Sequence, residues 1–248
     1  MESELLLTFL VLVVLGSYVQ TVSGFAIALI LTGGITALGL APIPFTANVV
    51  SFVALANVAT ALHKRYHDIN LTLMAYSALG LLLFSGVGLV LLNYLSKNAV
   101  SLLEILLGIS ILIGGIMLMM HPHPIKRVSS NSLHLVVGSV GGLFSGLFSA
   151  GGPPIAIHFY RQPLPFSEVR ATLLVLLGIM SIIRLGMEGA SGHIGMDVLQ
   201  LSAVSMPVSI LATLAARRFP PPLSDLAMRR FAFGILCVMG LSLIIGGL

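Results

Sequence analysis

The stretch Gly141-Gly-Leu-Phe-Ser-Gly-Leu-Phe-Ser-Ala-Gly-Gly-Pro-Pro-Ile155 decides how this chain folds. It lies inside a strongly apolar segment, yet its five glycines and two prolines oppose a continuous helix. Each glycine costs about 1 kcal/mol of helix stability relative to alanine, and each proline costs about 3 kcal/mol. In a bilayer, every backbone group that leaves a helix must find a partner inside the protein or in a water-filled cavity. We therefore predict a broken helix here, and broken helices are the best sequence indication of a transporter's binding site.

The composition predicts an all-α polytopic membrane protein. Of the 248 residues, 57% are hydrophobic and only 8% are charged, whereas soluble domains are about one quarter charged. The formal net charge of +4 comes from basic residues in short loops rather than from a patch or arm, so the partner we expect is the lipid bilayer and no nucleic acid. With Cys237 as the single cysteine, neither a disulfide framework nor a cysteine-based metal site is possible. We expect no metal and no cofactor.

Two apolar segments, residues 5–40 and 133–160, are too long for one crossing, since a span needs about 20 residues. The first has 36 residues, roughly 54 Å of helix against a bilayer core of about 30 Å. It carries weak breaks at Ser23-Gly24 and again at Gly33-Gly34. We interpret both segments as broken-helix hairpins that leave the membrane on the side they entered. The other expected spans are residues 45–62, 71–95, 100–120, 166–187, 194–216 and 228–248.

The basic residues favour the hairpin topology. With two hairpins, ten of the twelve lysines and arginines lie on one face, which the positive-inside rule makes cytoplasmic. Only Lys97 and Arg184 lie toward the outside, and both termini are then expected outside. The ten cytoplasmic residues are Lys64, Arg65, Lys126, Arg127, Arg161, Arg170, Arg217, Arg218, Arg229 and Arg230.

The hairpin topology also predicts two inverted repeats, residues 1–120 and 133–248, joined by a cytoplasmic linker over 121–132. Each repeat holds a hairpin and three crossings, an odd number, so the second repeat is inverted relative to the first. Residues 16–28 overlay residues 141–153 at an offset of 125, and Gly108-Ile109 overlays Gly234-Ile235 at an offset of 126. Each match is weak alone, but nearly constant offsets in chain order indicate a duplication. Inverted repeats place a substrate site at their interface near the membrane midplane.

Residues 142–154, with Tyr160 and Phe166-Ser-Glu-Val-Arg-Ala-Thr172, resemble the second-half signature of the TauE/SafE family of membrane permeases. Val19-Gln-Thr-Val-Ser-Gly-Phe-Ala26 is similar to the opening motif of that family. A second glycine usually follows the Gly-Phe pair there, and Ala26 takes its place in this chain. The resemblance covers nearly the whole chain. It implies export of sulfite, a sulfonate or a related small organic anion, across a bacterial inner membrane.

The candidate site lies at the two helix breaks. Helix N-termini offer unpaired N–H groups and a partial positive charge to an anion, and Pro153 and Pro154 suit the first turn of a new helix. We expect the two breaks to face each other and to hold one anion. The alternative is that the polar residues link helices and the small ones allow close packing. The candidate substrate-binding residues are Gln20, Ser23, Gly24, Asn48, Ser145, Ser149, Gly151, Gly152, Arg170 and Thr172.

Ionisable residues inside the membrane are few, and such residues are costly and usually functional. Arg170 could reach the anion from the cytoplasmic side or extend to the interface. Arg184 and Glu188, four residues apart, are expected to form a structural pair near an outer helix end. His158 could carry a proton, although a lone histidine is more often a satisfied structural residue.

The function that these features favour is a secondary transporter, an exporter of a small anion that works by alternating access. The chain has no nucleotide-binding motif, so a gradient or a separate partner must drive it. An anion channel through the paired breaks is the first alternative. A membrane-embedded enzyme is the second, and it would gain support if Arg184, Glu188 or His193 converged on one pocket.

Overall fold

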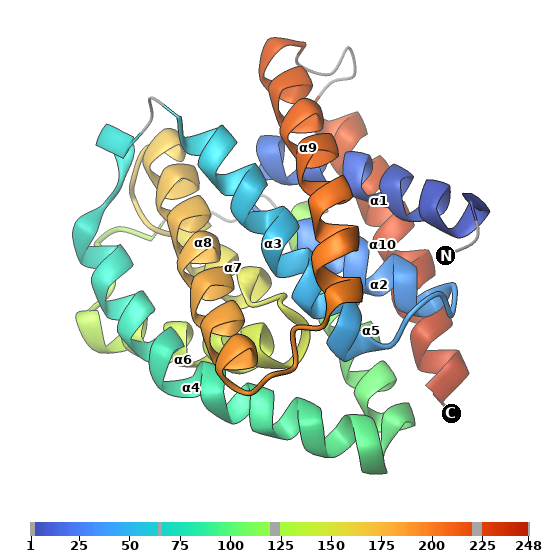
Figure 1. Cartoon of the computed structure of the whole chain (residues 1–248). Helices are drawn as coiled ribbons and strands as arrows, with labels where there is room; N and C mark the ends of the chain where they lie inside the picture. The colour runs from blue at the N-terminus through green and yellow to red at the C-terminus, as the bar shows by residue number, and fades with distance from the viewer. Residues whose placement is uncertain (1–2, 64–65, 120–124, 220–224, 248) are drawn as a thin grey trace.

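The computed structural model describes residues 3–63, 66–119, 125–219 and 225–247. These residues form helices joined by short loops, and they contain no strand (Figure 1). The all-α fold class is therefore confirmed. The helices are α1 Ser3–Ser23, α2 Ile27–Ala37, α3 Ile43–Leu62, the 3-10 turn η1 Tyr66–Asp68, α4 Leu71–Asn98, α5 Val100–Met119, α6 Asn131–Phe148, α7 Gly152–Tyr160, α8 Phe166–Ala190, α9 Met196–Arg218 and α10 Asp225–Gly247.

Six helices of the described residues, α1, α3, α4, α6, α8 and α9, are long and apolar enough to cross a membrane. Their exposed faces carry large apolar side chains, such as Val90 and Leu211, which are 71% and 67% exposed. Lipid tails, rather than water, suit such faces. The chain is therefore a multi-pass membrane protein, as its composition predicts.

Some predicted positions cannot be compared with the structure. Lys64, Arg65, residues 121–124 of the predicted linker, residue 248 and the side chains of Arg229 and Arg230 lie outside the described residues.

Each long apolar segment is a pair of helices separated by three residues. The first break, residues 24–26, separates α1 from α2, and the second break, residues 149–151, separates α6 from α7. The ends of the second pair meet, because the backbone N–H of Ile125 donates to the carbonyl of Arg161 at 2.8 Å. The ends of the first pair also meet, since Leu6 and Leu40 line one cavity. Both segments thus turn back toward their starting points.

The expected second interruption of the first hairpin, at Gly33-Gly34, is wrong, because α2 continues through both glycines. These glycines serve packing. A Cβ atom at Gly33 would lie 2.4 Å from Ile111 Cδ1, and one at Gly34 would lie 3.0 Å from Leu12 Cδ1. Their small size lets α1 and α5 approach α2 closely.

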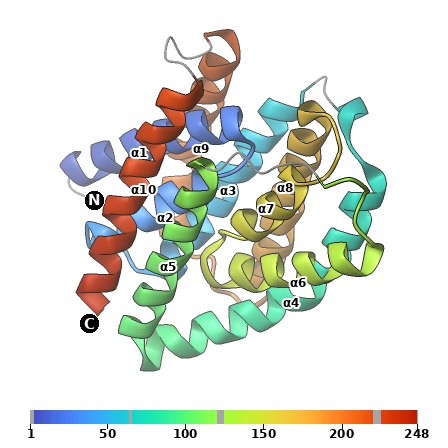
Figure 2. The same cartoon turned by 180° about the vertical axis from the view of Figure 1, so that it is seen from behind.

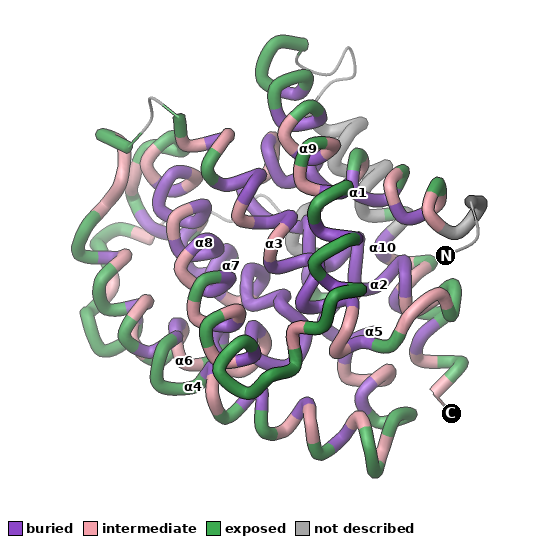
Figure 3. The backbone as a smooth tube through the Cα atoms, in the orientation of Figure 1, coloured by how far each residue is buried: buried purple, intermediate pink, exposed green. Residues whose placement is uncertain are grey.

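The two short helices lie at the centre of the molecule, with longer helices around them (Figure 2). All residues of α2 from Ile27 to Ile35 are buried, and most of α7 is buried as well (Figure 3). Outside them, α4 and α6 pack backbone against backbone. A Cβ atom at Gly138 of α6 would lie 2.1 Å from the carbonyl oxygen of Ser77 in α4. In a bilayer the hydrophobic effect does not drive helices together, so close van der Waals packing of this kind holds them in contact.

Candidate functional site

The two breaks line one small cavity of about 20 Å3. Gln20, Ala26, Ile27, Ala28, Leu29 and Ala54 line it from the first half of the chain, and Ser149, Ala150, Gly152, Pro153, Leu177 and Ser181 line it from the second. The N-terminal ends of α2 and α7 therefore lie at the same place. The first N–H groups of a helix have no partner within that helix. The structure thus brings together Gln20, Ser149 and Gly152 of the candidate residues at a point where two helix N-termini meet.

The first break depends on two left-handed residues, Gly24 with φ of 83° and Ala26 with φ of 111°. Side chains other than glycine rarely adopt this backbone region, which explains why a glycine suits the position of Ala26. Gln20 holds the start of α2 in place. Its Oε1 accepts from the N–H of Ile27 at 3.2 Å, and its Nε2 donates to Asn57 Oδ1 at 2.9 Å.

Ser23, Gly24 and Arg170 lie together on the α1 side of the first break, and none of them lines the cavity. The hydroxyl of Tyr160, at the end of α7, donates to the carbonyl of Ser23. The guanidinium of Arg170 donates to the carbonyl of Thr21. A cation at the C-terminal end of a helix is favourable because the exposed carbonyls carry partial negative charge. Arg170 therefore caps α1 in this conformation.

The second break turns at Ser149, whose φ is 58°. The Ser149 hydroxyl lies 2.8 Å from the hydroxyl of Ser51 in α3. Gly151 needs no unusual backbone angle, since its φ is −72°. It must nevertheless be small, because a Cβ atom there would lie 2.2 Å from the carbonyl oxygen of Gly141.

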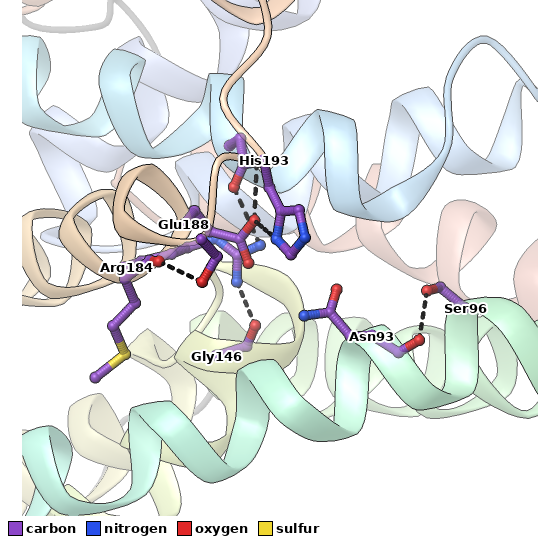
Figure 4. Close-up of polar contacts among 9 residues, drawn as sticks. Asn93, Ser96, Gly146, Arg184, Glu188 and His193 are labelled. Atoms are coloured by element: carbon purple, nitrogen blue, oxygen red, sulfur yellow. Dashed lines mark hydrogen bonds and ion pairs between the residues drawn. The ribbon is translucent and has the colours of Figure 1, made fainter.

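Beyond the second break, a buried polar cluster forms around Arg184 of α8 (Figure 4). Its Nη1 donates to the carbonyls of Ser145, at 3.2 Å, and Gly146 at the end of α6. Its Nη2 donates to Asn48 Oδ1 at 3.4 Å. Asn48 Nδ2 in turn donates to Glu188 Oε2 at 3.4 Å, and that oxygen lies 3.3 Å from His193 Nδ1.

The expected structural pair of Arg184 and Glu188 is absent as a direct contact within 4.0 Å among the described residues. Asn48 lies between the two side chains and binds both. Arg184 instead turns to the carbonyls at the end of α6, which offer it partial negative charge. The sequence interpretation did not predict that Arg184 is buried. The position of this arginine, eighteen residues after the start of an apolar span, could have indicated it.

Thr172 does not line the cavity, and its hydrogen bonds are made elsewhere. Its hydroxyl accepts from the backbone N–H of Asn70 at 2.9 Å and donates to the carbonyl of Glu168 at 2.7 Å. Asn70 is the residue that caps the start of α4. Thr172 therefore fixes the start of α4 against α8.

His158 has a histidine partner. Its Nε2 lies 2.8 Å from Nδ1 of His134, and both side chains are buried. Gln162 Nε2 also donates to the backbone carbonyl of His158 at 2.9 Å. The pair links the start of α6 to the end of α7, so it closes the second hairpin. His134 was not recognised from the sequence, because nothing in the spacing shows that the two histidines meet.

A larger cavity, about 560 Å3, lies between the start of α1, the loop after α2 and the start of α9. Leu6, Leu40 and Phe45 make its walls apolar, and Asp197 gives it negative charge. Neither break lines it. The smaller cavity is therefore the better candidate for an anion.

Comparison with known proteins assigns the chain to a family. The family described as "Sulfite exporter TauE/SafE" matches residues 8–243. A protein of Cupriavidus necator named "Probable sulfite/organosulfonate exporter TauE" is 41% identical over 248 residues, which cover 99% of this chain and 97% of the relative. No solved structure matches the chain. Members of this family are transporters and not enzymes, so the chain of contacts from Arg184 through Asn48 to Glu188 and His193 is no sign of catalysis. The chain belongs to the TauE/SafE family of sulfite exporters.

Proposed function

We propose that this protein exports sulfite or an organosulfonate across a bacterial inner membrane, by alternating access, with the anion held between the two helix breaks. The family and its relative from Cupriavidus necator support the substrate class. The observation that carries the mechanism is that both breaks line one cavity. An anion there meets the N-terminal ends of α2 and α7, where the helix dipoles favour negative charge. Ala28 and Leu29 of α2 and Gly152 of α7 supply N–H groups without a partner in their own helix, whereas Pro153 and Pro154 supply none.

The inverted repeat, with its first unit over residues 1–120 and its second over 133–248, is part of this proposal. Equivalent helices pack against each other in opposite directions. In the pair α3 and α8, Asn48 contacts Glu188, while Val58 packs on Gly178. In the pair α5 and α10, Gly108 packs on Gly240, while Ser101 packs on Gly247. Antiparallel packing of equivalent helices is what a two-fold axis in the membrane plane produces.

The size of the cavity implies movement during transport. About 20 Å3 suits a single water molecule, and sulfite is larger. The two repeats must therefore separate at the breaks before an anion can enter. Alternating access requires the repeats to separate on one side of the membrane at a time, whereas a channel needs a continuous path.

The test is sulfite transport by the purified protein in liposomes, with two glycine variants compared. Gly152→Leu places a large side chain in the cavity, next to Phe25 and Leu177, and should abolish transport. Gly186→Leu is the matched control, because Gly186 has open space around it, and it should transport normally. Sulfite-driven exchange of labelled sulfite indicates a carrier, and flux that does not saturate indicates a channel. Normal transport by Gly152→Leu would mean that the second break serves helix packing and does not bind the anion.

The orientation is tested by cysteine labelling in a Cys237→Ser background. We expect a cysteine at Lys126 to react from the cytoplasm and one at Gly192, in the loop between α8 and α9, to react from outside. This assignment follows from the positive-inside rule and places both termini outside. The reverse labelling would contradict it.

A further inference from the structure

We propose that Arg184, Asn48 and Ser145 form a second anion subsite, beside the cavity, which binds the oxygen atoms of a sulfite or sulfonate group. The proposal rests on the proposed function and deepens it, because it adds a second binding position on the path of the anion. None of the three residues lines the cavity itself. The subsite lies toward the end of α8, which the basic residues place outside.

The three residues lie on three different helices, Arg184 and Ser145 about one turn from cavity residues and Asn48 about one turn from the partner of a cavity residue. On α8, Arg184 follows the cavity residue Ser181 by three positions. On α6, Ser145 precedes the cavity residue Ser149 by four, and the Ser149 N–H donates to the Ser145 carbonyl. On α3, Asn48 precedes Ser51, the partner of Ser149, by three. Residues three or four apart share a helix face and differ by about 5 Å along the axis. The cluster is therefore a second polar layer, continuous with the cavity.

The chemistry of the cluster suits an anion. The Arg184 side chain is completely buried, and its Nε has no hydrogen-bond partner among the described residues. The Ser145 hydroxyl, also buried, likewise lacks a partner in the part of the chain that the structure describes. A desolvated cation is costly unless it is paired, and no described carboxylate lies within 4.0 Å of this guanidinium. The planar fork of a guanidinium matches the oxygen atoms of an oxyanion.

The next turn of α8 connects the subsite to the surface. Glu188 lies four residues beyond Arg184 and binds Asn48 and His193. The His193 side chain is 50% exposed, so the polar path reaches the surface there (Figure 4). An anion at Arg184 competes with Glu188 for the amide of Asn48 and is repelled by its carboxylate. Arg184 therefore attracts the anion out of the cavity, and Glu188 favours its release.

The test measures sulfite binding to the purified full chain by calorimetry, with the melting temperature of each ligand-free variant recorded in parallel. Arg184→Gln should weaken binding about tenfold or more, because it removes charge-assisted hydrogen bonds. Arg184→Lys should lie between this variant and the wild type, because lysine keeps the charge and loses the fork. Ser145→Ala should weaken binding about threefold. Lys97→Gln, which removes a positive charge from an exposed position, is the control and should bind as the wild type does.

The outcomes separate this subsite from the proposed function. If folded Arg184→Gln binds sulfite as the wild type does, the subsite is wrong and the proposed function stands. If Arg184→Gln yields no folded protein, Ser145→Ala and Arg184→Lys decide, and wild-type affinity in both overturns the subsite. A purely structural Arg184 would lower the melting temperature and leave the affinity of the folded protein unchanged. A wild-type protein that binds neither sulfite nor sulfoacetate contradicts the proposed function, and the subsite with it.

Discussion

The two helix breaks occupy equivalent places in the two halves of the chain, yet they are held by different means. At the first break, Gln20 caps α2, and Tyr160 and Arg170 bind the carbonyls at the end of α1. At the second, a hydroxyl pair joins Ser149 to α3, Thr32 of α2 donates to the carbonyl of Phe148, and Arg184 of α8 binds the carbonyls at the end of α6. Within the described residues, the Nε of Arg184 and the hydroxyl of Ser145 have no hydrogen-bond partner. The first break is therefore fixed by contacts within the protein. The second has donors left for a substrate, which makes it the half that we expect to respond to the anion.

The largest expected effect comes from a substitution that separates packing from backbone conformation. Gly151→Val places a Cβ atom against the carbonyl of Gly141, a backbone atom that cannot move aside. We expect a loss of about 3 kcal/mol or more and little folded protein. At the first break, a Cβ atom from Gly24→Ala meets the flexible Arg170 side chain at 3.3 Å and the Tyr160 hydroxyl at 3.4 Å, and the nearest backbone atom, Arg170 Cα, lies at an ordinary contact distance of 3.8 Å. Its cost should be about 1–2 kcal/mol, from the left-handed backbone alone.

Thermal unfolding in detergent measures both changes, with Gly186→Ala as a control in open space. Equal losses for Gly151→Val and Gly24→Ala would show that the two breaks are limited by the same factor. The contrast between close packing at Gly151 and backbone conformation at Gly24 would then fail.

A smaller effect tests how firmly each break is fixed. Gln20→Leu removes the acceptor for the Ile27 N–H and a partner of Asn57, so it should cost about 2 kcal/mol. Ser149→Ala removes one hydroxyl, and Ser51 keeps its bond to the carbonyl of Ala47, so the cost should stay below about 1 kcal/mol. Chemical or thermal unfolding gives the two values. A larger loss for Ser149→Ala would reverse the assignment of the fixed and the responsive break.

The sequence was sufficient to predict the fold class and the approximate place of each break. Glycines followed directly by prolines in an apolar segment indicate a broken helix, because a bilayer leaves broken backbone no water to bind. The sequence was misleading at Gly33-Gly34, because glycine both breaks helices and permits close packing, and only the neighbours Ile111 and Leu12 decide between these roles.

The candidate site was predictable only in part. Gln20, Ser149 and Gly152 line the cavity because they lie beside the breaks, and position in the chain is visible in a sequence. The role of a polar residue farther along a helix depends on which neighbour it faces. Thr172 faces the start of α4, and Arg184 faces the end of α6, more than thirty residues away in the chain. Rotation of one helix against another sets these contacts, and spacing alone does not reveal it.

The smallest expected effect concerns Ala26, which stands where a glycine suits the first break. An L-residue in the left-handed region costs about 1–2 kcal/mol, and Ala26 has φ of 111°. Ala26→Gly removes that strain but gives the unfolded chain more freedom, which offsets about 0.5–1 kcal/mol. We expect a net gain in stability of about 1 kcal/mol, read as a higher melting temperature. Ala28→Gly, two residues further into α2, is the matched control and should lose about 1 kcal/mol, because its backbone is helical. Opposite signs at positions 26 and 28 would mean that the first break is fixed despite a strained backbone, by the contacts of Gln20 and Tyr160. Two losses would mean that residue 26 is not left-handed, and the first break would then resemble the second more closely than its contacts indicate.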